Sequence, residues 1–229
     1  MKKKVLIFGM GLGSGFAKVF QEMGYEICIQ YRNEKKKLEY QHEYPGAKYM
    51  FSDLTDTNQI VQELVKLKNE GFMPDIIIQA AGSPMTDLAA VKGDILTQDQ
   101  LEEKSITEIK AVNFDNKVTT YDALFELNTG VNHPMRLFIV GSKAGEFTLD
   151  VARTFGEVGY HIVMKMIKDF VVSKNDPFLK AELIYPERNV DSKGLKAFSG
   201  QIKNETNEKI PEGEDPRIFA REIIQKYGL

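Results

Sequence analysis

Four glycines near the N-terminus could hold the pyrophosphate of a dinucleotide. They lie between the apolar run 5–8 and the helical-looking segment 16–20, and they are Gly9, Gly11, Gly13 and Gly15. Residues without a Cβ let the backbone approach the phosphates, and the next helix offers unpaired N–H groups and the positive end of its dipole. The spacing is GxxxGxG rather than GxGxxG, since Ser14 and Phe16 stand where a third glycine would be needed. Leu12 and Ser14, inside the loop, are further candidate cofactor contacts, although such a cluster also fits an ordinary turn.

Composition and length fit a single globular domain over residues 1–229. Hydrophobic residues make up 42% and charged residues 28% of the chain, which are ordinary globular values. A net charge of -3 and a pI near 5.8 give no basic footprint, so we expect no nucleic-acid partner. No window approaches the roughly 18 apolar residues of a membrane span. The one cysteine, Cys28, lies in an apolar run and cannot form an internal disulfide, which suits a cytoplasmic protein.

Strand-like and helix-like segments alternate along the chain. Strands are expected over 5–8, 26–31, 47–51, 75–79, 136–140 and 181–185, with helices over 56–70, 106–127, 155–173 and 216–227. This alternation predicts an α/β fold, a Rossmann-like doubly wound parallel sheet of six or seven strands with helices on both faces. The polar segment 187–215 follows the last strand and is either a substrate lid or a surface excursion.

Further motifs follow these strands in the order found in short-chain dehydrogenases/reductases, and over nearly its whole length the chain resembles that family. Residues 53–56 read Asp-Leu-Thr-Asp, and residues 79–82 read Gln-Ala-Ala-Gly where the family has Asn-Asn-Ala-Gly. The segment 186–192 resembles a Pro-Gly…Val-x-Thr stretch, with Glu187 in place of the glycine. Beyond the glycine loop, the cofactor contacts that the resemblance implies are Asp53, Leu54, Ala80, Ala81, Gly82, Pro186 and Val190.

The resemblance also implies a catalytic group of four residues. Asn113 matches the active-site asparagine of the long helix, and Ser142 matches the serine that hydrogen-bonds the substrate oxygen. Tyr160 would be the acid/base, and Lys165 the lysine that anchors the cofactor. The implied activity is hydride transfer between a nicotinamide and a small carbonyl or alcohol substrate. The implied assembly is a homodimer or homotetramer through helices 106–127 and 155–173.

The Tyr-x-x-x-Lys pair of the family is displaced in this chain. Met164 stands four residues after Tyr160, and Lys165 stands five after it. On a regular helix a fourth neighbour lies about 40° round from its partner and a fifth about 140°, so Lys165 reaches Tyr160 only through a distortion such as a π-bulge. The alternative register pairs His161 with Lys165. With Met164 in the lysine's place, the enzyme is weakened or specialised toward reduction, or the protein is a non-catalytic dinucleotide sensor.

A second departure concerns the last strand. The chain ends at Leu229 without the family's usual seventh-strand segment, which predicts a sheet whose sixth strand lies nearer an edge.

Cofactor preference is predicted from the end of the second strand. An acidic residue there favours NAD(H), whereas an arginine can neutralise the 2′-phosphate of NADP(H). The segment 30–33 reads Gln-Tyr-Arg-Asn, and Lys35, Lys36 and Lys37 follow it. Arg32 therefore predicts NADP(H) over NAD(H), although the lysine run could simply be a solvated helix face.

The three histidines show no ligand spacing, so no metal is expected.

Overall fold

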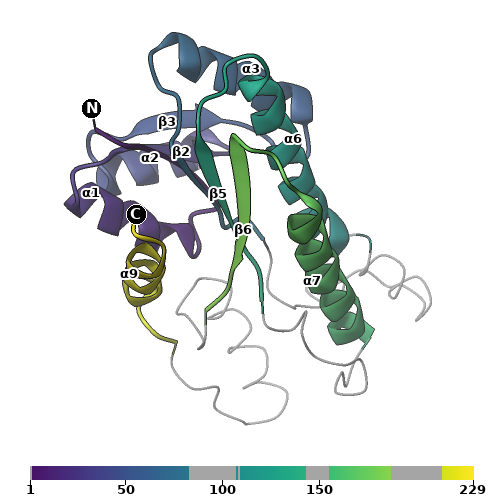
Figure 1. Cartoon of the computed structure of the whole chain (residues 1–229). Helices are drawn as coiled ribbons and strands as arrows, with labels where there is room; N and C mark the ends of the chain where they lie inside the picture. The colour runs from purple at the N-terminus through teal and green to yellow at the C-terminus, as the bar shows by residue number, and fades with distance from the viewer. Residues whose placement is uncertain (1, 83–106, 108, 143–154, 187–212) are drawn as a thin grey trace.

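The computed structural model describes residues 2–82, 107, 109–142, 155–186 and 213–229 (Figure 1). Its strands are β1 Lys4–Phe8, β2 Glu26–Tyr31, β3 Lys48–Phe51, β4 Ile76–Gln79, β5 Met135–Val140 and β6 Leu179–Ile184. They pair in parallel in the order β3-β2-β1-β4-β5-β6. This order confirms the predicted doubly wound sheet, and within the described residues β6 forms one of its edges.

The helices alternate with the strands as the sequence predicts. They are α1 Gly13–Glu22, α2 Glu34–Glu43, α3 Thr57–Asn69, α6 Asn116–Asn128, α7 Phe155–Ser173 and α9 Pro216–Tyr227. The helix expected over 106–127 is not regular, because the segment η1, Ala111–Asp115, is a π-helix that runs directly into α6. Sequence periodicity did not predict this wider turn. No helix among the described residues has the length and apolarity that a bilayer span requires.

Helices cover both faces of the sheet, and each face has its own hydrophobic core. Because successive strand residues point to opposite sides, Leu6 and Ile77 join one core while Ile7 and Ile78 join the other. Helices α3, α6 and α7 pack on the first face, and α1 and α9 pack on the second (Figure 1). The inner strands are therefore buried on both sides, as their continuous apolar runs predict.

The direction of chain progression reverses between β1 and β4. From β1 the chain moves outward to β2 and β3, and then returns to place β4, β5 and β6 on the other side. In open α/β sheets ligands bind at the carboxyl ends of the strands that flank such a reversal. The glycine loop follows β1, and the segment Ala80–Gly82 follows β4, so both lie at this point.

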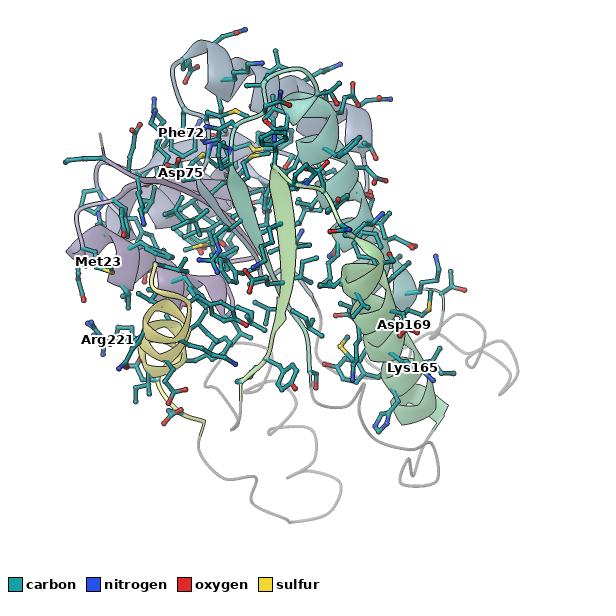
Figure 2. The ribbon with its side chains drawn as sticks, in the orientation of Figure 1. Met23, Phe72, Asp75, Lys165, Asp169 and Arg221 are labelled. Atoms are coloured by element: carbon teal, nitrogen blue, oxygen red, sulfur yellow. The ribbon has the colours of Figure 1, made fainter. Side chains whose placement is uncertain are left out.

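The C-terminal helix α9 packs directly on α1, and Gly15 makes this possible. A Cβ at residue 15 would overlap the backbone carbonyl of Pro216. Beside this contact the rings of Phe16 and Phe219 meet edge to face at 5.6 Å, and Arg221 pairs with Glu22 at 2.5 Å. Figure 2 shows Arg221 and Met23 on this side of the molecule. Gly15 is thus required by helix packing, whatever it contributes to ligand binding.

Replacing Gly15 by alanine is therefore expected to destabilise the fold by about 2–3 kcal/mol, because two backbones must separate to admit the methyl group. Urea unfolding of Gly15→Ala measures the loss. Gly11→Ala is the matched control, since a Cβ at residue 11 meets nothing within 4 Å. Equal stabilities of the two variants would contradict the packing role of Gly15.

Candidate active site

The loops after β1 and β4 lie against each other, backbone on backbone. Gly9 has a φ of 80°, and a Cβ there would overlap the backbone of Ala80 and Ala81. A Cβ on Gly13 would come within 2.8 Å of the Ile7 Cγ2 atom, whereas Gly11 is exposed and has open space around it. Gly9 and Gly13 are therefore glycines because neighbouring protein atoms require it. Gly11 alone leaves room above the loop for a ligand.

The first turn of α1 has no side-chain cap. Helices α2, α3 and α9 begin with side-chain caps, from Asn33, Asp56 and Asp215 respectively. In α1 the capping position is Leu12, which has no side-chain hydrogen bond to give, while the Ser14 hydroxyl donates to the Gly11 carbonyl at 2.9 Å. Within this turn the Gly13 N–H donates to the Gly9 carbonyl and the Gly15 N–H donates to the Leu12 carbonyl, both at 3.2 Å. The positive dipole end of α1 lies beside Gly11, an arrangement that fits a phosphate.

Arg32 and Asp53 follow the neighbouring strands β2 and β3 and are both exposed. Asp53 accepts hydrogen bonds from the N–H and the hydroxyl of Thr55, which lower the pKa of its carboxyl, and the charge of Arg32 lowers it slightly further. Leu54 packs against the core below. The carboxylate of Asp53 therefore shapes its own turn, and the Arg32 guanidinium is the cation beside it.

The lysine run on α2 is largely engaged within its own helix. Lys36 pairs with Glu39 at 2.5 Å, and Lys37 pairs with Glu34 at 3.4 Å. Hydrogen bonds to Tyr31 and Glu34 raise the pKa of Lys37. These two lysines fit the solvated-face interpretation better than a role in phosphate binding.

A buried polar network holds the β4 loop to α6. The Gln79 side chain donates to the Thr120 hydroxyl at 2.6 Å and accepts from the Ala81 N–H at 2.9 Å. The Ala81 carbonyl accepts from the Lys117 ammonium at 2.7 Å and from the Asn116 amide at 3.4 Å. Gln79 stands where the resembled family has asparagine, and its side chain connects the β4 loop to α6.

Sequence reasoning missed Lys117. Its side chain is only 2% exposed, and burial alone lowers the pKa of its ammonium to about 7. The available signal was spacing: Lys117 follows Asn113 by four residues and precedes the buried Leu124 by seven, so all three share one helix face. A buried lysine needs a hydrogen-bond partner to offset its loss of hydration, and for Lys117 that partner is the Ala81 carbonyl.

Asn113 lies in the π-turn and faces the β4 loop. It is 3% exposed, and its amide donates to the Ile109 carbonyl at 3.1 Å. A Cβ on Gly82 would come within 2.7 Å of the Asn113 Oδ1 atom, so the loop passes close over this side chain. Asn113 thus lies beside Gly82 of the β4 loop, and its role in an active site stays a prediction.

Tyr160 on α7 and Ser142 after β5 are brought together by the fold. Their hydroxyls form a hydrogen bond. Burial raises the pKa of the Tyr160 phenol, and the Ser142 hydroxyl partly offsets the rise. The phenol therefore carries its proton at neutral pH.

Lys165 is not brought to Tyr160. Helix α7 is regular over Phe155–Ser173, without the bulge that would have turned Lys165 inward. Lys165 is exposed and lies on the side of α7 away from the sheet (Figure 2). Met164 occupies the inner position and is 5% exposed, and His161 is buried. The expected anchoring role of Lys165 beside Tyr160 therefore has no support in the geometry. The alternative register, His161 with Lys165, stays a prediction.

The remaining predicted residues lie at the same sheet edge or outside the described residues. Pro186, partly buried, comes two residues after the end of β6. Val190 and most of the expected lid over 187–215 lie outside the described residues. Among the described residues no group of His, Cys, Asp and Glu side chains could hold a metal ion.

Solved structures share this fold across nearly the whole chain. An actinorhodin polyketide ketoreductase with NADPH gives a TM-score of 0.76 at 12% identity, covering 98% of this chain and 89% of its own. A gluconate 5-dehydrogenase from Burkholderia cenocepacia J2315, in complex with NADP and tartrate, gives 0.69 at 18% identity, covering 98% and 88%. The chain thus has the fold that this ketoreductase and this dehydrogenase share.

The fold does not by itself select a reaction. A structure described as ribose-5-phosphate isomerase from Brucella melitensis 16M matches with a TM-score of 0.76 at 10% identity, covering 97% of this chain and 84% of its own. No protein-family model matches this chain, and neither does any curated protein sequence. Its function has to be argued from the site.

The buried Lys117 is expected to cost stability, and the cost should depend on pH. The pKa of its ammonium is lower in the folded protein than in the unfolded chain, so the unfolded chain binds the proton more tightly. The cost is full at and below about pH 7 and disappears as the pH rises toward the ordinary lysine pKa of 10.5. Lys117→Met should therefore be more stable than the natural protein by about 2 kcal/mol at pH 6.5, and by much less at pH 9.5.

Urea unfolding at several pH values checks this expectation. Lys66→Met on the exposed surface of α3 is the control and should change stability by less than about 0.5 kcal/mol at every pH. A stability difference for Lys117→Met that stays constant with pH would contradict the burial of a titrating ammonium.

Proposed function

We propose that this protein is an NADP(H)-dependent oxidoreductase that transfers a hydride between the nicotinamide and a small carbonyl or alcohol compound. The observation that carries the proposal is the hydrogen-bonded pair of Tyr160 and Ser142. It lies at the same sheet edge as the uncapped first turn of α1. A proton donor, Tyr160, lies beside a hydroxyl, Ser142, that could bind a carbonyl oxygen. Together with a glycine loop that could bind a dinucleotide, this pair suits carbonyl reduction.

Each residue of the pair has a distinct task in this reaction. The bound coenzyme supplies the hydride to the carbonyl carbon. Ser142 donates a hydrogen bond that holds the carbonyl oxygen, and Tyr160 gives that oxygen its proton as the negative charge develops. The products are an alcohol and the oxidised coenzyme, and Tyr160 regains its proton from water.

Reduction is the direction that the site favours. Burial raises the pKa of Tyr160, so at neutral pH the phenol holds the proton that reduction requires and very little phenolate is present to act as a base. Met164, where the resembled family has its lysine, provides no charge to stabilise a phenolate. Oxidation of the alcohol would need that phenolate, and we expect it to become appreciable only at strongly alkaline pH.

Arg32 and the named ligands of similar structures support NADP(H) as the coenzyme. Arg32 is exposed beside the ends of β2 and β3, where an adenosine ribose would lie against the sheet edge. The ketoreductase and the gluconate dehydrogenase were solved with NADPH and NADP. The alternative, a non-catalytic dinucleotide sensor, is favoured by one observation, the outward position of Lys165.

The predicted homodimer or homotetramer stays a prediction. On α6 and α7, Phe125, Ile162 and Val172 are exposed apolar side chains that such an assembly could cover.

Replacing Tyr160 by phenylalanine should abolish turnover while sparing coenzyme binding. Loss of the proton donor is expected to lower kcat by about 10²–10⁴-fold against any carbonyl that the natural protein reduces. The Kd for NADPH should change less than about twofold, because the phenyl ring fills the same space. Tyr25→Phe, at the start of β2, is the matched control. Full activity of Tyr160→Phe would refute the acid role, and tight NADPH binding without turnover in the natural protein would favour the sensor.

Replacing Arg32 by serine should weaken NADPH selectively. Loss of a charge-assisted hydrogen bond to the 2′-phosphate is expected to raise the Kd for NADPH about 10–100-fold. The Kd for NADH, which lacks that phosphate, should change less than about threefold. Fluorescence titration of both coenzymes measures the effect, with the exposed Lys68→Ser on α3 as control. Equal or tighter binding of NADH by the natural protein would overturn the preference.

A further inference from the structure

Lys117 is a buried cation directly behind the loop that would bear the coenzyme. Its ammonium donates to the Ala81 carbonyl at 2.7 Å, and a Cβ on Gly82 would come within 3.8 Å of the same nitrogen. The Ala81 backbone in turn lies against Gly9 of the glycine loop. Two consecutive contacts thus join the ammonium to the β4 loop and the β4 loop to the glycine loop.

No charged partner accompanies Lys117 among the described residues. On its own helix stretch Lys110 and Asp115 pair with each other at 2.6 Å, and both are partly exposed. The elements packed around it carry the following titratable groups: Tyr160, His161, Lys165, Lys168 and Asp169 on α7, and Lys48, Tyr49, Asp53, Asp56, Glu63, Lys66 and Lys68 on the segment from β3 through α3. None of these groups contributes to the pKa of Lys117, for which burial is the only cause.

A lysine in this state responds to any negative charge brought nearby. Near neutral pH its charged and neutral forms have similar free energies, so a modest external field decides between them. A dinucleotide adds several negative charges at the glycine loop and displaces water there. Weak screening inside the protein carries their field to the ammonium.

Resting on the proposed dinucleotide binding, we propose that Lys117 takes up a proton when the coenzyme binds. The resulting ammonium strengthens the hydrogen bond to the Ala81 carbonyl and so holds the β4 loop against Gly9. Lys117 is then a positioning residue that acts through the loop rather than by touching the substrate. It makes the affinity for the coenzyme depend on pH.

The sign of this dependence follows from linkage. Phosphate charges raise the pKa of Lys117 in the complex above its value in the free protein. The complex therefore binds more protons than the free protein between the two pKa values, and affinity falls as the pH rises through that interval. Each unit of difference between the two pKa values corresponds to a tenfold change in affinity.

Calorimetric titration with NADPH in buffers of different ionisation enthalpy tests the proposal. At pH 7.5–9 the 2′-phosphate, with a pKa near 6, is already ionised and contributes little proton uptake. The natural protein should take up a fraction of a proton, and its affinity should fall about tenfold between pH 7 and 9. Lys117→Met should show no uptake and a change of less than about threefold. Lys66→Met should behave as the natural protein does.

A second variant separates proton uptake from loop support. Lys117→Gln keeps a hydrogen-bond donor but cannot titrate, so it should lose the proton uptake as the methionine variant does. Binding of NADPH to the natural protein without proton uptake overturns this inference alone. Uptake that persists in both variants of Lys117 also overturns it. Failure of the natural protein to bind NADPH overturns the proposed function itself.

Discussion

The close approach of two backbones, Gly9 after β1 and Ala81 after β4, is the constraint on which the site depends. It places the glycine loop and the β4 loop in one surface at the reversal point of the sheet. Any side chain at residue 9 would separate the loops, and it would also be strained at a φ of 80°. The first turn of α1, which has no side-chain cap, follows one of these loops, and Gly82 beside Asn113 lies in the other.

Polar groups behind that contact hold it in place at a cost in stability. The π-turn at Ala111–Asp115 contains Asn113, and the helix that follows directs Asn116, Lys117 and Thr120 to the β4 loop. An apolar side chain at this position would stabilise the fold more than a buried lysine with one carbonyl partner does. The hydrogen bonds hold the inner side of the β4 loop and leave its outer side free for a ligand. Active sites often lower the stability of the fold in this way.

The site holds fewer of the catalytic side chains than the resemblance to the dehydrogenases implies, because within the described part of the chain no lysine lies beside Tyr160. The phenol of Tyr160 has a hydroxyl partner in Ser142, but on α7 the inner position four residues later holds Met164 instead of a cation. A phenol in such surroundings is a proton donor at neutral pH. The similar structures include both reductases and an isomerase, so these side chains, rather than the fold, decide the reaction class.

The sequence by itself indicated the alternation of strands and helices, the doubly wound parallel sheet with helices on both faces and the position of the glycine loop, because apolar periodicity and glycine spacing are local signals. The family resemblance singled out Asn113, Ser142 and Tyr160, and the structure puts Asn113 beside Gly82 and Ser142 beside Tyr160. Only the tertiary structure assigned Gly15 to the contact with α9, turned Lys165 outward and brought Lys117 under Ala81. Those outcomes depend on which side of a helix meets a neighbour distant in sequence, and a local pattern does not carry that information.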